Sequence, residues 1–191
     1  MPDSPEAIDL SGKMLIAMPS MGDPRFSRSV ILVCTHSDEG AMGLIINKPA
    51  KQIRFKSLLK QLGIDAKVTG KGPTIGLGGP VENARGFVLH SDDYQSEETT
   101  MDVPGGFAMT STQNILADIA NGIGPEKAKL ALGYSGWGPG QLEQEIQDNG
   151  WLVCDADEDL IFGLDDAGKW NQALGLLGIN PLMLSATGGR A

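Results

Sequence analysis

The sequence predicts an α+β protein with a largely antiparallel, strongly curved sheet in a single domain. Short apolar runs typical of strands outnumber the segments with helical spacing. The two kinds of segment do not alternate one for one, as they would in a doubly wound parallel sheet. A chain of 191 residues is long enough for one well-buried core and short for two.

Nine apolar runs between Gly, Pro, Asn and Asp residues are interpreted as strands. They are KMLIAM, SVILVCT, MGLIIN, TIGLGG, GFVLH, GFAMT, KLALGY, WLVCD and LIF. Helical spacing occurs in four segments: FKSLLKQLGI, TQNILADIANG behind a Ser111 cap, GQLEQEIQDNG and AGKWNQALGLLGI. Residues 1–11 read as a flexible acidic tail, so that residues 12–191 form the domain.

The first two long runs predict a hairpin. A turn between His36 and Ala41 places Thr35 opposite Met42 and, with simple antiparallel pairing, Ser29 opposite Lys48. The loop before the first strand then folds against the segment after the second, while His36 lies at the far end.

This hairpin predicts a basic corner. Arg25, Arg28 and Lys48 converge there, and arginine offers a bidentate fork to phosphate or carboxylate. The alternative is that Asp23 pairs with one of these arginines and only fixes the loop. The predicted anion pocket, completed by a glycine loop, consists of Arg25, Arg28, Asn47, Lys48, Gly78 and Gly79.

The run KPAKQIRFKSLLK is basic within an acidic protein. One interpretation is a surface for nucleic acid or an acidic partner. The more common arrangement is a solvated helix face opposite buried Phe55, Leu58, Leu59 and Leu62, and this is the interpretation that we favour.

The glycine-rich segments match no phosphate-binding loop, because no GK is followed by Ser or Thr. GYSGW resembles part of a nucleophile elbow around Ser135, but Trp137 stands where the closing glycine belongs. We expect KLALGY to end in a glycine turn, followed by a helix that begins near Pro139 and Gly140.

Both histidines follow an apolar run and precede Ser-Asp. The secondary polar candidates are therefore His36, His90 and Ser91. The two rings either meet as an acid–base or metal-binding pair or, as we favour, cap strand ends by hydrogen bonds. No third ligand stands at a recognisable spacing, so no metal or other cofactor is predicted. DADED (155–159) alternates like a calcium loop, but Leu160 replaces the required glycine, which favours a solvated acidic turn.

The composition narrows the function. A net charge of -9 and a pI near 4.6 argue against a general nucleic-acid binder. Cys34 and Cys154 lie inside apolar runs and are expected to be buried free thiols of a reducing compartment. The acidic N-terminus lacks the pattern of a signal peptide, and no apolar run reaches the length of a membrane span. A cytoplasmic location is expected.

Long motifs in a fixed order identify a family. They are LIAMPSM, DPRF-x-RSVI, GAMGLIINKP, GGPV with GFVLHS, GYSGW-x-x-GQLE-x-E and WL-x-x-x-AD-x-x-LIF, followed by a helix around Trp170. From Gly12 onward the chain resembles the YqgE/AlgH family of small bacterial proteins, which have no assigned reaction. The resemblance implies a barrel-like sheet surrounded by helices and a bacterial cytosolic setting.

Some members of that family carry a provisional label as transcriptional regulators. This sequence argues against direct DNA binding, because no recognition helix follows KSLLKQLGI. The sequence favours a non-catalytic regulatory protein that binds a small anion or a protein partner and acts at most indirectly on transcription. The alternative is an enzyme of unknown class that uses a histidine in a polar cleft.

Overall fold

The computed structural model describes residues 8–65, 72–96, 99–111 and 113–184. Within these residues, nine strands form one sheet with the order β6-β7-β5-β8-β3-β2-β1-β9, and β4 pairs with β8 beside this path. The strands are β1 (Lys13–Ala17), β2 (Val30–Ser37), β3 (Gly40–Ile45), β4 (Ile75–Leu77), β5 (Val81–Ser91), β6 (Thr100–Val103), β7 (Phe107–Thr110), β8 (Ala128–Trp137) and β9 (Trp151–Asp155). The helices are α1 (Phe55–Gln61), α2 (Asn114–Ala120), α3 (Gln141–Gln147), α4 (Glu158–Phe162) and α5 (Lys169–Leu176).

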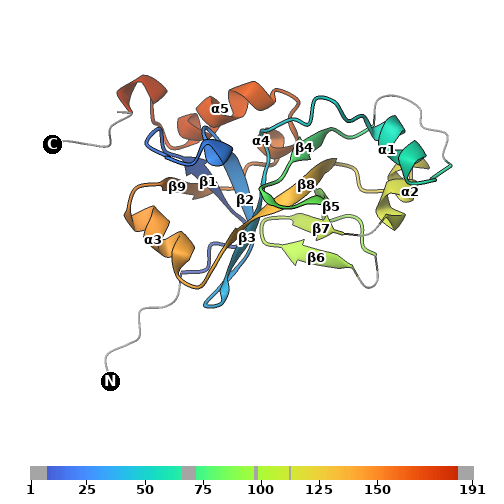
Figure 1. Ribbon diagram of the computed structural model, residues 1–191, viewed down its shortest axis with the longest axis horizontal. Helices are drawn as coiled ribbons and strands as arrows, with labels where there is room; N and C mark the ends of the chain where they lie inside the picture. Colours follow the sequence, from blue (N-terminus) through green and yellow to red (C-terminus); the bar gives the residue numbers. More distant parts are fainter. Residues whose placement is uncertain (1–7, 66–71, 97–98, 112, 185–191) are drawn as a thin grey trace.

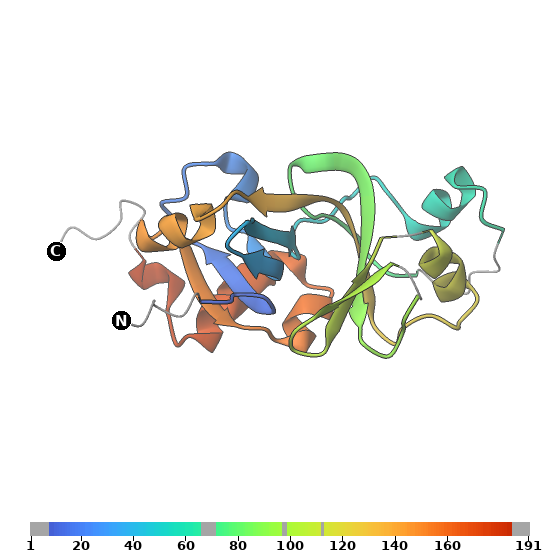
Figure 2. The same ribbon diagram turned by 90° about the horizontal axis from the view of Figure 1, so that it is seen from below.

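Strand β8 joins the two halves of the molecule (Figures 1 and 2). Its residues 128–134 pair with β5, and its last residues, 135–137, pair with β3. Every strand pair is antiparallel except β4 with β8. The predicted α+β class, with a curved and largely antiparallel sheet in one domain, is therefore confirmed.

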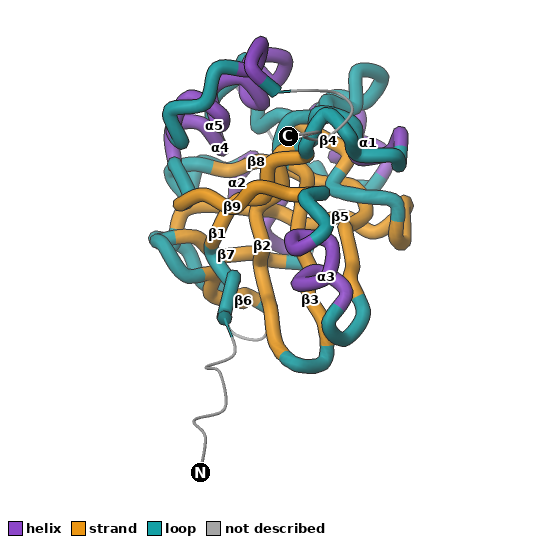
Figure 3. The backbone as a smooth tube through the Cα atoms, turned by 90° about the vertical axis from the view of Figure 1, so that its left-hand side faces the viewer, coloured by secondary structure: helices purple, strands orange, loops and turns teal. Residues whose placement is uncertain are grey.

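The two faces of β1 and β2 are covered by different helices (Figure 3). Met14 and Ile16 pack in one apolar cluster with Leu174 of α5, and the alternate residue Leu15 packs in another with Leu142 of α3. Successive side chains of a strand point to opposite faces. This period therefore explains why the runs 14–17 and 30–34 are apolar without interruption.

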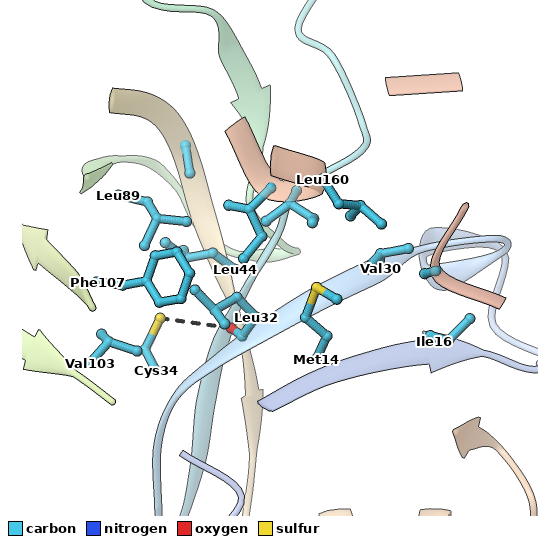
Figure 4. Packing of buried hydrophobic residues seen from close by; sticks show 14 of the residues in the cluster. Met14, Ile16, Val30, Leu32, Cys34, Leu44, Leu89, Val103, Phe107 and Leu160 are labelled. Atoms are coloured by element: carbon cyan, nitrogen blue, oxygen red, sulfur yellow. Dashed lines mark hydrogen bonds between the residues drawn. The ribbon is translucent and has the colours of Figure 1, made fainter. Parts of the chain in front are cut away.

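The first cluster forms the centre of the core (Figure 4). Cys34 is buried there, and its thiol donates a hydrogen bond to the carbonyl oxygen of Leu32. Burial raises the pKa of Cys34 to about 12, so the thiol stays protonated. Cys34 and Cys154 are both free and buried, as predicted for their position, while the reducing compartment stays a prediction.

The hairpin of β2 and β3 forms with a different register at its open end. Thr35 lies opposite Met42, as predicted. The register then shifts between Val33 and Thr35, so that Ile31 lies opposite Ile45. The pairing of Ser29 with Lys48 is therefore wrong, because an extra residue in β2 moves the partner strand by one position.

Three other expectations are corrected. LIF is not a strand but the end of α4, because the Asp157 side chain accepts a hydrogen bond from the Leu160 amide and caps a helix there. The GYSGW segment is not a turn, since β8 continues to Trp137 and the turn follows at 138–140. Strand β6, at the edge of the sheet, was not predicted.

The glycines of GLGG and GYSGW allow two chain segments to cross. A Cβ atom on Gly79 would lie 2.1 Å from the carbonyl carbon of Tyr134, and one on Gly133 would lie 2.5 Å from the Gly79 oxygen. Gly133 also has a φ of 71°, which favours glycine. The link from β4 to β5 can therefore pass directly against β8.

Residues 1–7 of the predicted tail lie outside the described residues. Leu10, which was also assigned to that tail, has only 7% of its surface exposed. Its amide donates a hydrogen bond to the His36 ring. Among the described helices, none combines the length and the apolar character that a transmembrane helix requires.

Candidate anion-binding site

Arg28, Asn47 and Lys48 lie together at the open end of the β2–β3 hairpin. They line a small cavity of about 170 Å³ against the start of α5, which we call the polar corner. Its lining residues are Ser27, Arg28, Asn47, Lys48, Asp166, Ala167, Trp170 and Asn171. The hairpin therefore brings three of the predicted site residues to one place.

Asn47 holds the loop of the polar corner. Its side-chain oxygen accepts a hydrogen bond from the Val30 amide at 2.9 Å, and its side-chain nitrogen donates to the Arg28 carbonyl oxygen at 2.9 Å. Arg28 has a φ of 53°, an unfavourable conformation for a side chain of this size. The amide of Asn47 thus fixes a strained turn and leaves the ligand chemistry to its neighbours.

Within the described part of the chain, the two cations of the corner, Arg28 and Lys48, have no acid partner. The Arg28 guanidinium carbon lies 5.1 Å from the centre of the Trp170 ring, which is anchored by its own hydrogen bond to the Ala17 carbonyl oxygen. The Lys48 ammonium donates to the Ser27 carbonyl oxygen at 3.1 Å. A cation on an aromatic face and an ammonium with unused donors can both receive an anion.

Arg25 is placed differently. Its guanidinium donates to both oxygens of Asp23, with an Nη2–Oδ2 distance of 2.7 Å, and it does not line the polar corner. The hydrogen bond from Arg25 lowers the pKa of Asp23. This is the alternative in which an aspartate pairs with one of the arginines and fixes the loop.

Gly78 and Gly79 also lie outside the lining of the corner. The Gly78 carbonyl oxygen accepts hydrogen bonds from the Ile45 amide at 2.9 Å and from the Ser135 hydroxyl at 3.1 Å. Both glycines belong to the crossing of the β4–β5 link over β8. The hydroxyl of Ser135 is buried in this contact, a structural position for the serine of GYSGW.

Behind the polar corner lies a buried charge cluster that the sequence did not predict. One carboxylate oxygen of Asp166 lies 3.1 Å from the Lys129 ammonium and 2.7 Å from the Lys169 ammonium. Lys169 donates further to the carbonyl oxygens of Ile46 and Ile161. The lysine side chains are 6% and 1% exposed, so two buried cations share a single carboxylate.

Such a cluster is electrostatically unbalanced. Burial and the neighbouring Lys169 lower the pKa of Lys129 to about 8, while Asp166 opposes this shift. With both lysines protonated, the cluster has an excess of one positive charge. The negative charge of Asp166 is therefore offset where it lines the polar corner.

Asp166 also lines a second cavity, of about 580 Å³, which we call the wide cavity. The link from β3 to α1 forms much of its wall and runs towards α1 along the upper edge of Figure 1. The cations Lys51, Arg54 and Lys56 line it. Lys56 and Lys60 are exposed on α1 opposite the buried Phe55 and Leu59, as favoured for a solvated helix face. Lys51 and Arg54 precede the helix, so the prediction holds only for the part of the basic run that lies on α1.

The free cations of the described residues gather in one region. Six take part in no ion pair: Arg28, Lys48, Lys51, Arg54, Lys56 and Lys60. The first five line the polar corner or the wide cavity. In a chain of net charge -9 this is a local reversal of sign, which concentrates anions at the two cavities.

His36 is already bonded at both ring nitrogens. Its Nδ1 accepts a hydrogen bond from the Leu10 amide at 3.0 Å, and its Nε2 donates to a carboxylate oxygen of Glu143. Only 3% of its side chain is exposed. The ring ties the chain before β1 to α3 at the far end of the hairpin from the polar corner.

His90 and Ser91 serve a separate set of contacts. The His90 ring donates to the Ser91 carbonyl oxygen at 2.7 Å and accepts from the Thr110 hydroxyl at 2.8 Å, and burial lowers its pKa. The Ser91 hydroxyl joins Asp93 to the Lys127 amide. The two histidines share no partner. Among the described residues no group of three or more His, Cys, Asp or Glu is placed to bind a metal ion.

A weak sequence signal for the missed cluster existed. Lys129 is the second residue of β8 and directly precedes the buried Leu130 and Ala131, and Lys169 lies one turn from the buried Ala173 of α5. A lysine in such a position needs a buried counter-ion. Which of the 24 acids supplies it follows only from the folded structure.

The curved sheet with a helix on each face of its β1–β2 region defines a single-domain α+β protein of the half-barrel kind. The AlgH-like family matches residues 14–182, and the chain belongs to that family. A UPF0301 protein of Ruegeria pomeroyi is 59% identical over 186 residues, which cover 96% of this chain and 100% of the relative. Another, from Paracoccus denitrificans, is 53% identical and covers 97% and 99%. The predicted family is confirmed.

The structure resembles solved structures, among them the following two. The solution structure of the AlgH protein from Pseudomonas aeruginosa has a TM-score of 0.77 and 41% identity, and the match covers 100% of both chains. A crystal structure of a protein from Corynebacterium diphtheriae has a TM-score of 0.73 and 20% identity, covering 94% of this chain and 93% of that one. The second likeness concerns the fold alone.

Proposed function

We propose that the protein is a non-catalytic regulatory protein that binds a small anion in the polar corner. Arg28 and Lys48 are the anion-binding residues, and Asn47 is the positioning residue that holds their loop. A cytosolic role with at most an indirect effect on transcription belongs to the same proposal.

The observation that carries this proposal is the absence of an acid partner for Arg28 and Lys48 among the described residues. Both lie at a cavity whose inner wall contains Asp166, itself shared by two buried lysines. Free cations on the rim and excess positive charge behind it favour a negative ligand. A volume of about 170 Å³ suits a group of the size of phosphate or carboxylate.

The alternative is an enzyme with a histidine as general base. Its geometry has less support, since both ring nitrogens of His36 and of His90 are engaged in hydrogen bonds within the fold. A base must reach the proton of a substrate. Neither histidine is among the residues that line the polar corner or the wide cavity.

Isothermal titration calorimetry with inorganic phosphate tests the proposal. Arg28→Gln and Lys48→Gln remove one charge each at similar length, and each is expected to weaken binding at least tenfold, in line with loss of a charge-assisted hydrogen bond. Arg25→Gln and Arg85→Gln are the matched controls, because both arginines are exposed and paired with an acid. Unchanged melting temperatures exclude loss of the fold as the cause.

Two results would contradict the proposal. The first is an absence of binding by the wild-type protein at millimolar phosphate and low salt. The second is binding that survives in both corner variants, which would place the anion elsewhere.

A further inference from the structure

We propose that the ligand occupies the polar corner and the wide cavity together, and that it is a phosphorylated molecule with an apolar body. The phosphate binds at Arg28 and Lys48, and the apolar body lies in the wide cavity, with Lys51 and Arg54 available to further phosphate oxygens. This inference rests on the proposed function, of which it specifies the ligand class.

The two cavities are adjacent because one residue lines both. Asp166 contributes to the wall of the polar corner and to that of the wide cavity. The chain also links the two cavities directly, because Lys48 lines the polar corner and the next residue, Pro49, lines the wide cavity. A ligand can therefore pass from one to the other along the 48–51 segment without crossing a layer of the fold.

The dividing carboxylate does not oppose such a ligand. Asp166 lies within 3.1 Å of both buried ammonium groups, which supply one charge more than it carries. An anion that passes over Asp166 therefore meets a wall whose local charge is not negative. The two buried lysines thus neutralise Asp166 in the cavity wall and need not contact the ligand.

The apolar part of the inference comes from the wide cavity. Among its lining residues, Leu164 is 83% exposed and Ile53 is 36% exposed, next to the cations Lys51 and Arg54. The volume of about 580 Å³ lies in the range of small-molecule sites. Exposed apolar side chains beside free cations fit a ligand that has both kinds of surface, and a bare polyanion would leave the apolar ones unused.

Two sources supply this shared chemistry, a nucleotide and an isoprenoid diphosphate. We expect calorimetry to find ADP or geranyl diphosphate, each with two phosphates, bound at least tenfold more tightly than inorganic pyrophosphate. In the first case the body is a planar base, and in the second it is a hydrocarbon chain. Comparison of the two titrations identifies which body the wide cavity accepts.

A pair of variants separates the apolar contact from the ionic one. Leu164→Ser should weaken binding of the organic ligand at least threefold and leave the affinity for pyrophosphate unchanged. Leu182→Ser is the matched control, because Leu182 is 90% exposed and lines neither cavity. Arg28→Gln should weaken both ligands.

The inference is overturned if neither organic ligand binds more tightly than pyrophosphate, or if Leu164→Ser affects all ligands equally. In that case the proposed function would still stand if phosphate binds to the wild-type protein and Arg28→Gln weakens this binding. Absence of phosphate and pyrophosphate binding would remove both.

Discussion

Cations at the outer edge of the sheet form ion pairs, whereas the cations that line the two cavities form none with the described residues outside the buried Asp166 cluster. At the edge, Lys13 pairs with Asp155 across β1 and β9, and Arg25 pairs with Asp23. In the polar corner and the wide cavity, five cations have no acid partner within the described residues, and the nearest carboxylate is shared by two buried lysines. The difference separates charges that stabilise the fold weakly from charges that remain available to a ligand.

The comparison also shows what burial adds. Asp155 is 88% exposed and screened by water, whereas Asp166 is 13% exposed beside lysines that are almost fully buried. An exposed ion pair contributes little to stability, but a buried cation that loses its partner is costly. The same type of contact therefore has different consequences in the two regions.

The largest expected effect is that of Asp166→Asn. It leaves Lys129 and Lys169 without a counter-ion, and the free energy of unfolding should fall by about 3 kcal/mol or more. Asp155→Asn, the matched change at the exposed edge, should have a much smaller effect, because water screens that pair. Urea denaturation of both variants measures the difference. Equal losses would mean that the buried cluster is not held together by its charges.

A smaller effect appears in the pH dependence. Because the folded-state pKa of Lys129 is lowered from 10.5 to about 8, the unfolded chain binds a proton between these values that the folded protein lacks. The Lys129 site therefore makes the free energy of unfolding rise with pH across this window. Relative to Lys129→Met, the wild-type protein should gain on the order of 2 kcal/mol between pH 8 and 10.5.

Lys127, two residues earlier, provides the control of opposite sign. Its hydrogen bond with Glu158 raises its pKa, so its contribution is present below pH 10.5 and is lost at higher pH. The wild-type protein should gain nothing over Lys127→Met in the same window. If stability relative to Lys129→Met falls with pH, the desolvation of Lys129 described above is wrong.

The sequence predicted the elements that depend on local patterns. Strands β1 and β2 follow from uninterrupted apolar runs, and the meeting of Arg28 with Lys48 follows from the hairpin. The bulge at Cys34 changes no apolar pattern, so the register at the open end could not be predicted. The three residues of LIF are too few to distinguish a strand from a helix, and the cap by Asp157 decided the outcome.

The candidate site was predictable only in part, for a related reason. Arg28, Asn47 and Lys48 are brought together by a single turn, which a sequence pattern can reveal. The contact between Lys129 and Asp166 joins residues 37 positions apart, and it depends on how the 3-10 turn Asp166–Gly168 lies against β8. Whether Arg25 pairs with Asp23 or remains free for a ligand could be decided only from the positions of the side chains.

Chemical-shift mapping by NMR tests the central claim most directly. When pyrophosphate is added to the ¹⁵N-labelled protein at low salt, the account predicts saturable shifts of the backbone amides at 27–28, 47–48, 50–51 and 166–171. The amides around Lys13 and Asp155, where the charges are paired, should not move. Shifts confined to that edge, or no saturable shift at any amide, would contradict the account.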